Sequence, residues 1–143
     1  MASEGGARMN IYYKIKNTLC DIWYPFKYRC QRFAHGYADE DMFNIDLWFV
    51  NTVKPMLVYL KDHGAGFPGE FDDEDEWHNV LAEMINCLDF MDEDYVCNFL
   101  GFCEIEDIMK MKTEDFKKVH DLINENKDKF FQLFSKYFYY LWD

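Results

Sequence analysis

The chain lacks a long hydrophobic run. No apolar segment comes near the roughly 20 residues that a membrane-spanning helix needs, because charged residues interrupt each of them. The first eight residues are small and polar, unlike the apolar core of a signal peptide. We therefore expect no contact with a membrane and a location in the cytoplasm.

Sequence motifs for catalysis are also missing. The chain contains neither a phosphate-binding Walker loop nor a GxGxxG turn. Its two serines, Ser3 and Ser135, stand outside any nucleophile elbow, and the histidines do not follow a metal-ligand spacing. A conventional enzyme is therefore disfavoured, and we predict no catalytic residue, no metal site and no cofactor.

Cysteine is present in an odd number and without a CxxC pair. We expect free thiols in a reducing compartment rather than disulfides. Three of the five lie at apolar positions of predicted helices, where we expect them to be buried. These are Cys20, Cys30 and Cys87, and the other two are Cys97 and Cys103.

Basic residues are scarce, with 15 Lys and Arg against 27 Asp and Glu, a net charge of −12. Residues 1–38 hold six basic residues against two acidic ones, a net of +4. Residues 39–94 hold two against sixteen, a net of −14, and residues 95–143 hold seven against nine, a net of −2. Repulsion by phosphates excludes general nucleic-acid binding, although the basic segment could hold one small anion.

Helical periodicity dominates the first half of the chain. Apolar spacing predicts a helix over residues 10–24, and Pro25 is expected to kink or restart it. A short helix over residues 26–35 ends at Gly36, and Asp39 is the predicted N-cap of a long helix to about Lys61. Pro55 is expected to bend that helix.

The second half of the chain is predicted to form two further helices. One is predicted from Asp73 to Met91, and its inward positions are Trp77, Val80, Leu81, Met84, Ile85 and Leu88. The other begins at Thr113, the predicted cap, and includes the apolar run 130–142. Residues 92–112 have no clean period and are expected to be partly helical.

These elements predict an all-α fold, a single compact bundle of about four main helices with no sheet. We expect residues 1–9 to be disordered or derived from the expression vector, and residues 10–143 to form one helical domain. The run 130–142 is apolar on more than one face, which favours deep burial or a subunit interface and hence a homo-oligomer.

One pattern resembles a family of small, largely uncharacterised proteins of bacteriophages and prophages. The pattern is Arg32-x-x-His35-Gly36-Tyr37-x-Asp39-x-Asp41-x-Phe43-Asn44-Ile45-Asp46. The family usually has Arg in place of His35 and Trp in place of Phe43. Further matches are the loop Gly64-x-Gly66-Phe67-Pro68, Trp77 with Met84, and the ending Tyr137-Phe138-x-x-Leu141-Trp142-Asp143.

The resemblance covers about residues 29–91 and 130–143. It implies a phage origin, a compact helical fold and a location in the host cell cytoplasm. Small accessory phage proteins often antagonise host defence by sequestering a nucleotide signal or an effector. That implication concerns the class of protein and does not rest on particular residues.

The basic segment predicts a pocket for a nucleotide-like anion, because arginine binds phosphate with two parallel hydrogen bonds and aromatic rings stack on bases. The predicted ligand-binding residues are Lys27, Arg29, Arg32, His35, Tyr37, Asp46 and Trp48. The alternative is structural: Arg32 pairs with Asp39 or Asp46 and fastens the junction between two helices. That structural alternative is favoured.

Two other functions remain open. A metal-dependent nucleotide hydrolase would use Asp39, Asp46 and Glu83, although Asp39 as a cap and Asp46 as an ion-pair partner is the simpler interpretation. A protein antagonist of host defence would use the acidic face from Asp72 to Asp94. The acidic run 72–76 is also explained as a solvated helix start.

Overall fold

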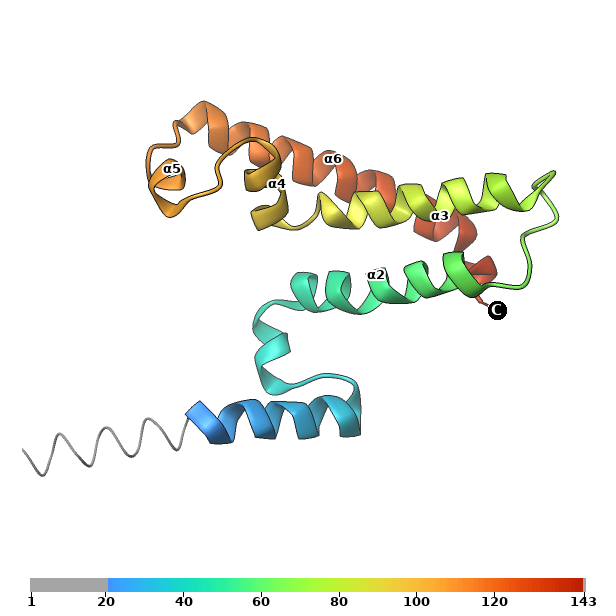
Figure 1. The fold of residues 1–143 in the computed structure, drawn as a ribbon, viewed down its shortest axis with the longest axis horizontal. Coiled ribbons are helices and arrows are strands. Elements are labelled where there is room, and N and C mark those ends of the chain that lie inside the picture. The colour runs from blue at the N-terminus through green and yellow to red at the C-terminus, as the bar shows by residue number, and fades with distance from the viewer. Residues whose placement is uncertain (1–20, 143) are drawn as a thin grey trace, which may run out of the picture. The chain divides into compact units, whose positions relative to one another are not determined.

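The computed structural model describes residues 21–142, and Figure 1 shows its ribbon. The chain divides into two compact units, Met1–Ile45 and Asp46–Asp143. The predictions for residues 1–9, and most of the helix predicted over 10–24, lie outside the described residues. A single domain over residues 10–143 stays a prediction.

Every regular element within residues 21–142 is a helix, and no strand occurs there. The predicted all-α helical bundle is therefore confirmed. In that same part of the chain, no helix combines the length and the hydropathy needed to cross a lipid bilayer.

The first unit contains a helix over residues 21–35. The expected restart of the helix at Pro25 is wrong, because the helix runs through it, and the kink stays a prediction. The carbonyl that loses its partner belongs to Asp21, which is exposed, so water can satisfy it. The predicted stop at Gly36 is confirmed: its φ is +79°, and its N–H donates to the carbonyl of Arg32 at 2.9 Å.

The predicted long helix from Asp39 to Lys61 is in fact two elements. A 3-10 helix, η1 (Asp39–Phe43), is followed by Asn44 and then by α2 (Ile45–His63), which contains Pro55. The N-cap of η1 is Ala38, so the prediction of Asp39 as the cap is wrong. The stabilising carboxylate is that of Asp41, which accepts the N–H of Ala38 at 2.7 Å.

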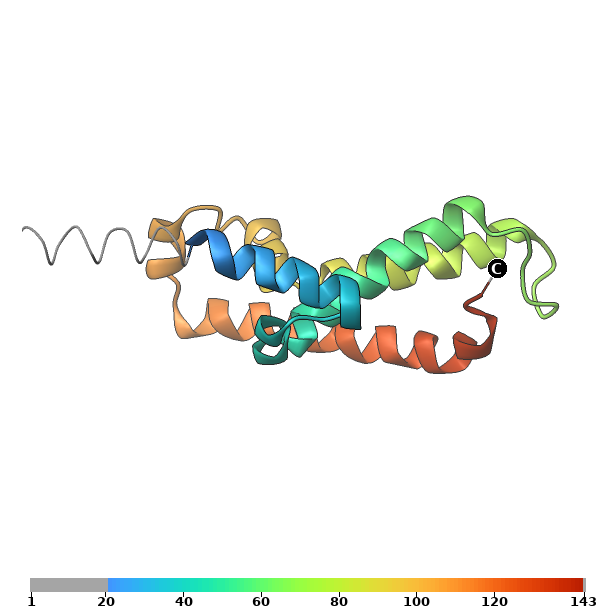
Figure 2. The same ribbon diagram turned by 90° about the horizontal axis from the view of Figure 1, so that it is seen from below.

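The second unit holds its core between α2, α3 (Glu74–Asp89) and α6 (Thr113–Tyr137). Figures 1 and 2 show α3 and α6 running in opposite directions. Asp73 is the N-cap of α3, and its carboxylate accepts the N–H of Glu76 at 2.9 Å. Four of the six predicted inward positions of α3 are buried: Trp77, Leu81, Met84 and Leu88. The other two, Val80 and Ile85, are partly buried and pack against the core.

The last long helix begins one residue differently from the prediction. Lys112 is the N-cap, and Thr113 is the first helical residue. The carboxylate of Asp115, three residues after the cap, accepts the N–H of Lys112 at 3.0 Å. This hydrogen bond stabilises the start of the helix. The helix ends at Tyr137, and a 3-10 turn, η2 (Phe138–Tyr140), follows it.

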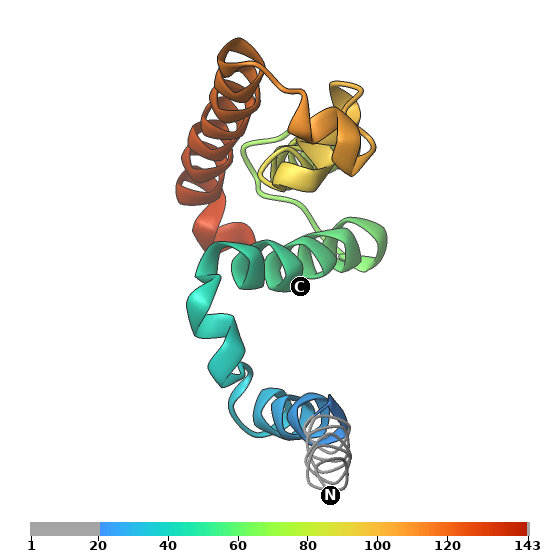
Figure 3. The same cartoon turned by 90° about the vertical axis from the view of Figure 1, so that its left-hand side faces the viewer.

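Residues 92–112 are partly helical, as predicted. They form α4 (Glu93–Phe99) and α5 (Ile105–Met109), which lie at the end of the unit that faces the viewer in Figure 3. The C-cap of α4 is Leu100, and Gly101 follows it at φ +88°. The N–H of Phe102 donates to the carbonyl of Cys97 at 2.8 Å. A second, smaller hydrophobic cluster forms here around Val96 and Val119.

The four cysteines in the described residues are free thiols. Cys87 is buried as predicted, and so is Cys97, and burial raises the pKa of both thiols. Cys30 is exposed, so its predicted burial is wrong. Cys30 lies at an apolar position of the helix over residues 21–35, but the apolar side of that helix is exposed. Cys20 lies outside the described residues.

Candidate functional site

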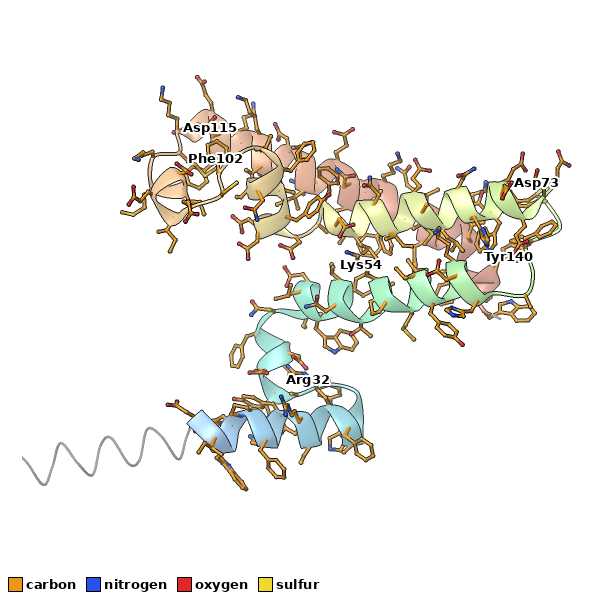
Figure 4. All side chains as sticks on the ribbon, in the orientation of Figure 1. Arg32, Lys54, Asp73, Phe102, Asp115 and Tyr140 are labelled. Carbon is orange, nitrogen blue, oxygen red and sulfur yellow. The ribbon has the colours of Figure 1, made fainter. Side chains whose placement is uncertain are left out.

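The candidate site is the junction between the helix over residues 21–35 and η1. The chain reverses at Gly36, and residues 38–41 return beside the polar side of the helix. Figure 4 shows Arg32 on the side of the helix that faces η1. All of these residues belong to the first unit.

Arg32 is held by two carboxylates. Its Nε donates to Oδ2 of Asp41 at 3.0 Å, and its Nη2 donates to Oδ1 of Asp41 at 2.5 Å and to Oε1 of Glu40 at 2.7 Å. The contact with Asp41 is the parallel, two-bond geometry that suits a guanidinium. The side chain of Arg32 is nearly half exposed, so water weakens this pairing.

These bonds shift the ionisation of both partners. The hydrogen bond from Arg32, followed by that from the N–H of Ala38, holds the pKa of Asp41 below its usual value. The hydrogen bonds to Asp41 and Glu40 raise the pKa of Arg32. Both groups are therefore charged across the physiological range, and each neutralises the other.

Lys27 has a carboxylate partner as well. Its Nζ lies 2.7 Å from Oδ2 of Asp39, and that hydrogen bond raises the pKa of Lys27. The backbone N–H of Asp39 donates to Oε1 of Gln31 at 3.1 Å, one helical turn beyond Lys27. Three consecutive acidic residues, 39–41, thus supply the partners of two of the predicted anion-binding cations.

The structural interpretation of Arg32 was right in kind and wrong in its partners. Neither Asp39 nor Asp46 pairs with Arg32; Asp41 and Glu40 do. The reason is the tight turn of η1, which begins at Ala38 and presents residues 40 and 41 to the helix. Because Asp39 was predicted as the cap, the carboxylates that pair with Arg32 were predicted incorrectly.

The other predicted ligand-binding residues divide between the two units. Arg29 is exposed and forms no ion pair with any residue of 21–142. The ring of His35 lies 6.3 Å from that of Tyr37, tilted by 43°. Asp46 and Trp48 stand in the first turn of α2 and belong to the second unit.

A metal site at the predicted carboxylates lacks support. Asp39 pairs with Lys27, and Glu83 pairs with Lys129 at 2.5 Å. No group of three or more His, Cys, Asp or Glu side chains with metal-ligating geometry occurs among the described residues. The hydrolase that would use Asp39, Asp46 and Glu83 stays a prediction without a geometric basis.

The opposite side of the same helix carries exposed apolar residues that were not predicted as a functional site. Ile22, Trp23, Phe26 and Phe33 are between 59% and 95% exposed. Positions 22, 26 and 33 share one helical face, away from the face of Gln31. Figure 4 shows ring side chains projecting from the helix on the side turned away from η1. We call this surface, formed by Ile22, Trp23, Phe26 and Phe33, the outer face.

The signal for the outer face was present in the sequence. Its apolar spacing predicts a helix with one apolar side, and such a side usually packs into a core. The charged residues between the apolar ones, Lys27 and Arg32, have their own acidic partners eight to twelve residues later. That pairing fixes the polar side of the helix toward η1 and leaves the apolar side outward.

Comparison of the chain with protein-family models, with curated proteins and with solved structures finds no match. The resemblance to phage proteins, and the function that it implies, therefore stay predictions.

Proposed function

We propose that this chain is an accessory binding protein that acts on a protein partner through the outer face. The carrying observation is the arrangement of the helix over residues 21–35. Its polar side is hydrogen-bonded to η1, while its apolar side is the more exposed one. This is the reverse of a helix that uses its apolar side to join a core.

The spacing of the outer face suits a helix that binds in a groove. Ile22, Phe26 and Phe33 follow one another at i, i+4 and i+11, the spacing of anchors on one side of an amphipathic helix. Trp23 adds a residue type that often contributes strongly to protein interfaces. A patch of this composition fits another protein better than it fits a small polar ligand.

Arg29 defines the charge of the expected partner. It lies one turn from both Phe26 and Phe33, at the edge of the outer face. Lys27 and Arg32 are neutralised inside the chain, so of the three cations in the helix over residues 21–35 Arg29 is the one left for an external partner. The partner surface is therefore an apolar groove with a carboxylate at its rim.

The same geometry weighs against capture of a small anion. A ligand would have to displace Asp39 from Lys27, and Asp41 and Glu40 from Arg32. The free energy gained from each hydrogen bond to the anion would be offset by the loss of the hydrogen bond between that cation and its carboxylate. Nucleotide capture at Lys27, Arg29, Arg32, His35 and Tyr37 stays a prediction that these contacts do not favour.

The acidic-face alternative has a structural explanation. Asp73 and Asp92 cap α3 and α4, and Glu83 and Asp89 pair with Lys129 and Lys54. Antagonism of a host defence protein remains the biological context that we favour, because the chain resembles small phage proteins. The partner would then be a host protein in the cytoplasm.

The experiment places a photo-crosslinking amino acid at position 33 in bacterial cells. A matched control carries it at Met109, which is 81% exposed on α5. We expect position 33 to crosslink to a protein that position 109 does not reach. The same set of crosslinked proteins from both positions would contradict the proposal.

The crosslinked protein is then purified and its affinity measured. Phe33→Asp should weaken binding by about 30-fold, the loss of one strong interface residue of roughly 2 kcal/mol. Met109→Asp should leave the affinity unchanged. Because Phe33 is almost fully exposed, both variants should keep the wild-type circular dichroism. Equal affinities for Phe33→Asp and wild type would refute the assignment of the outer face.

A further inference from the structure

The second unit has an apolar surface near its C-terminal end. A hollow of about 610 Å³ lies between α2 and residues 134–142, and a second of about 300 Å³ lies beside the loop 65–68. Trp142 lines both, so the two hollows are neighbours. Figure 4 labels Tyr140, which lines the smaller one.

The rim of these hollows is formed by large exposed side chains. Met56, Tyr59, Phe138 and Trp142 are between 54% and 72% exposed. Phe67 and Tyr140 are a little under half exposed. We call these six residues the C-terminal apolar surface.

The area of this surface is close to what one partner contributes to a stable interface. A fully exposed aromatic residue presents about 150–250 Å², so five that are half exposed present roughly 500 Å², and Met56 brings the total to roughly 600 Å². A standard interface takes about 800 Å² from each partner, and about 1,000 Å² in total is the lower bound for a specific one. Two copies of this surface exceed that bound.

Charge selects the surface through which two copies of this unit can approach each other. Residues 46–143 contain nine Lys against 22 Asp and Glu, a net of −13. Two units of that charge repel one another over most of their surface. Among residues 21–142, none that lines the two hollows is charged. Contact between copies through these lining residues therefore costs less electrostatic energy than contact between acidic parts of the surface.

We propose that the C-terminal apolar surface binds the same surface of a second copy of this chain, forming a two-fold symmetric dimer. In such a pair each residue of the surface faces residues of the same surface. The dimer uses only the second unit. It does not rest on the function proposed for the outer face, and either proposal can fail while the other holds.

The first test measures mass in solution by analytical ultracentrifugation. The wild-type chain should sediment at twice 17.3 kDa at micromolar concentration. Met56→Glu should raise the dimer dissociation constant at least tenfold, because it brings an acidic group of each copy to the interface. Glutamate is a good helix former and Met56 is exposed, so the helical content should not change.

Met109→Glu is the matched control, since it makes the same change at another exposed helical methionine. It should leave the dissociation constant within twofold of the wild type. A wild-type monomer, with or without an apolar small molecule in the hollow, would overturn the proposal. A dimer dissociation constant that rises as much in Met109→Glu as in Met56→Glu would overturn it as well.

The second test identifies what faces the surface. A photo-crosslinking residue at Tyr59 should give a covalent dimer in the full-length chain. Its crosslinked peptide should come from residues 53–60 or 134–142 of the other copy, which line the same hollow. A peptide from residues 21–35, or the absence of any adduct between copies, would refute the symmetric arrangement.

Discussion

Arg32 illustrates how one residue holds two segments of chain together. The guanidinium binds Asp41 with two hydrogen bonds and Glu40 with a third, and Asp41 also accepts the N–H of Ala38. Removal of the guanidinium would leave both carboxylates beside each other without a cation. Exposure to water limits the cost, because a solvated carboxylate needs no fixed partner.

We expect Arg32→Ala to lower the melting temperature by a few degrees at pH 7, as measured by circular dichroism without any ligand. Arg29→Ala should leave it unchanged, since Arg29 forms no ion pair with residues 21–142. The two variants remove the same charge from the same helix. A melting temperature for Arg32→Ala at or above that of the wild type would show that these contacts do not stabilise the chain.

The same comparison has a definite pH dependence. Arg32 lowers the folded-state pKa of Asp41 below the ordinary value of 3.8. A depressed carboxylate pKa stabilises the folded state above the unfolded pKa, and that stabilisation is lost as the pH falls through the folded value. The difference between wild type and Arg32→Ala should therefore be constant above about pH 5 and shrink below about pH 4. A difference that grows at low pH would contradict this assignment.

At the scale of the element, aspartates begin the helices in two ways. Asp73 and Asp92 are N-caps whose carboxylates accept backbone N–H groups of the first turn. Asp41, Asp107 and Asp115 lie three residues after the cap and accept the N–H of the cap residue itself. Both arrangements satisfy donors that the helix leaves without a partner.

Replacement of the cap of α3 tests this directly. Asp73→Ala should lower the free energy of unfolding by about 1 kcal/mol, because the N–H of Glu76 loses its acceptor. Asp73→Ser should retain most of the stability, since serine caps about as well. The measurement is urea unfolding followed by tryptophan fluorescence. A serine variant as unstable as the alanine variant would argue against the cap.

Across the whole molecule, the larger core joins residues from α2, α3 and α6. Phe130 is fully buried, and its ring lies 5.9 Å from that of Phe49 and 5.4 Å from that of Phe134. The polar contacts of this unit lie outside the core. Examples are the ion pairs Lys54–Asp89 and Lys129–Glu83, whose side chains are partly exposed.

Phe130→Ala should therefore lower the free energy of unfolding by about 3–5 kcal/mol, through lost burial and the cavity left behind. Phe131→Ala, at a neighbouring position that is nearly half exposed, should cost clearly less. Both are measured by urea unfolding, with the slope of the transition as a check on two-state behaviour. Equal losses in the two variants would mean that Phe130 does not hold the core together.

Local chemistry was enough to predict α3 and, to within one residue, the start of α6. The inward face of α3 repeats every three or four residues, and the predicted start at Asp73 lies one residue before the first helical residue, Glu74. Gly36 was also correct, because only a residue that readily takes a positive φ ends a helix in this way. These signals act within one or two turns of chain.

Errors arose where the start of a helix depended on a side chain three residues away. Ala38 and Lys112 carry no side chain that caps, and the sequence argument chose the nearest polar residues, Asp39 and Thr113. The carboxylates of Asp41 and Asp115 bond backward to the cap residues instead. Asp41, once bonded to Ala38, was then in position to bind Arg32.

The sequence by itself determined that residues 21–142 are mainly helical, that the helix over residues 21–35 ends at Gly36, and which faces of that helix and of α3 are apolar. Only the tertiary structure decided what each face contacts. The apolar faces of α3 and of the helix over residues 21–35 have the same kind of spacing, but one is buried and the other is exposed. Periodicity is a property of one segment, whereas burial requires a second segment to cover it, and the choice of that segment is not encoded locally.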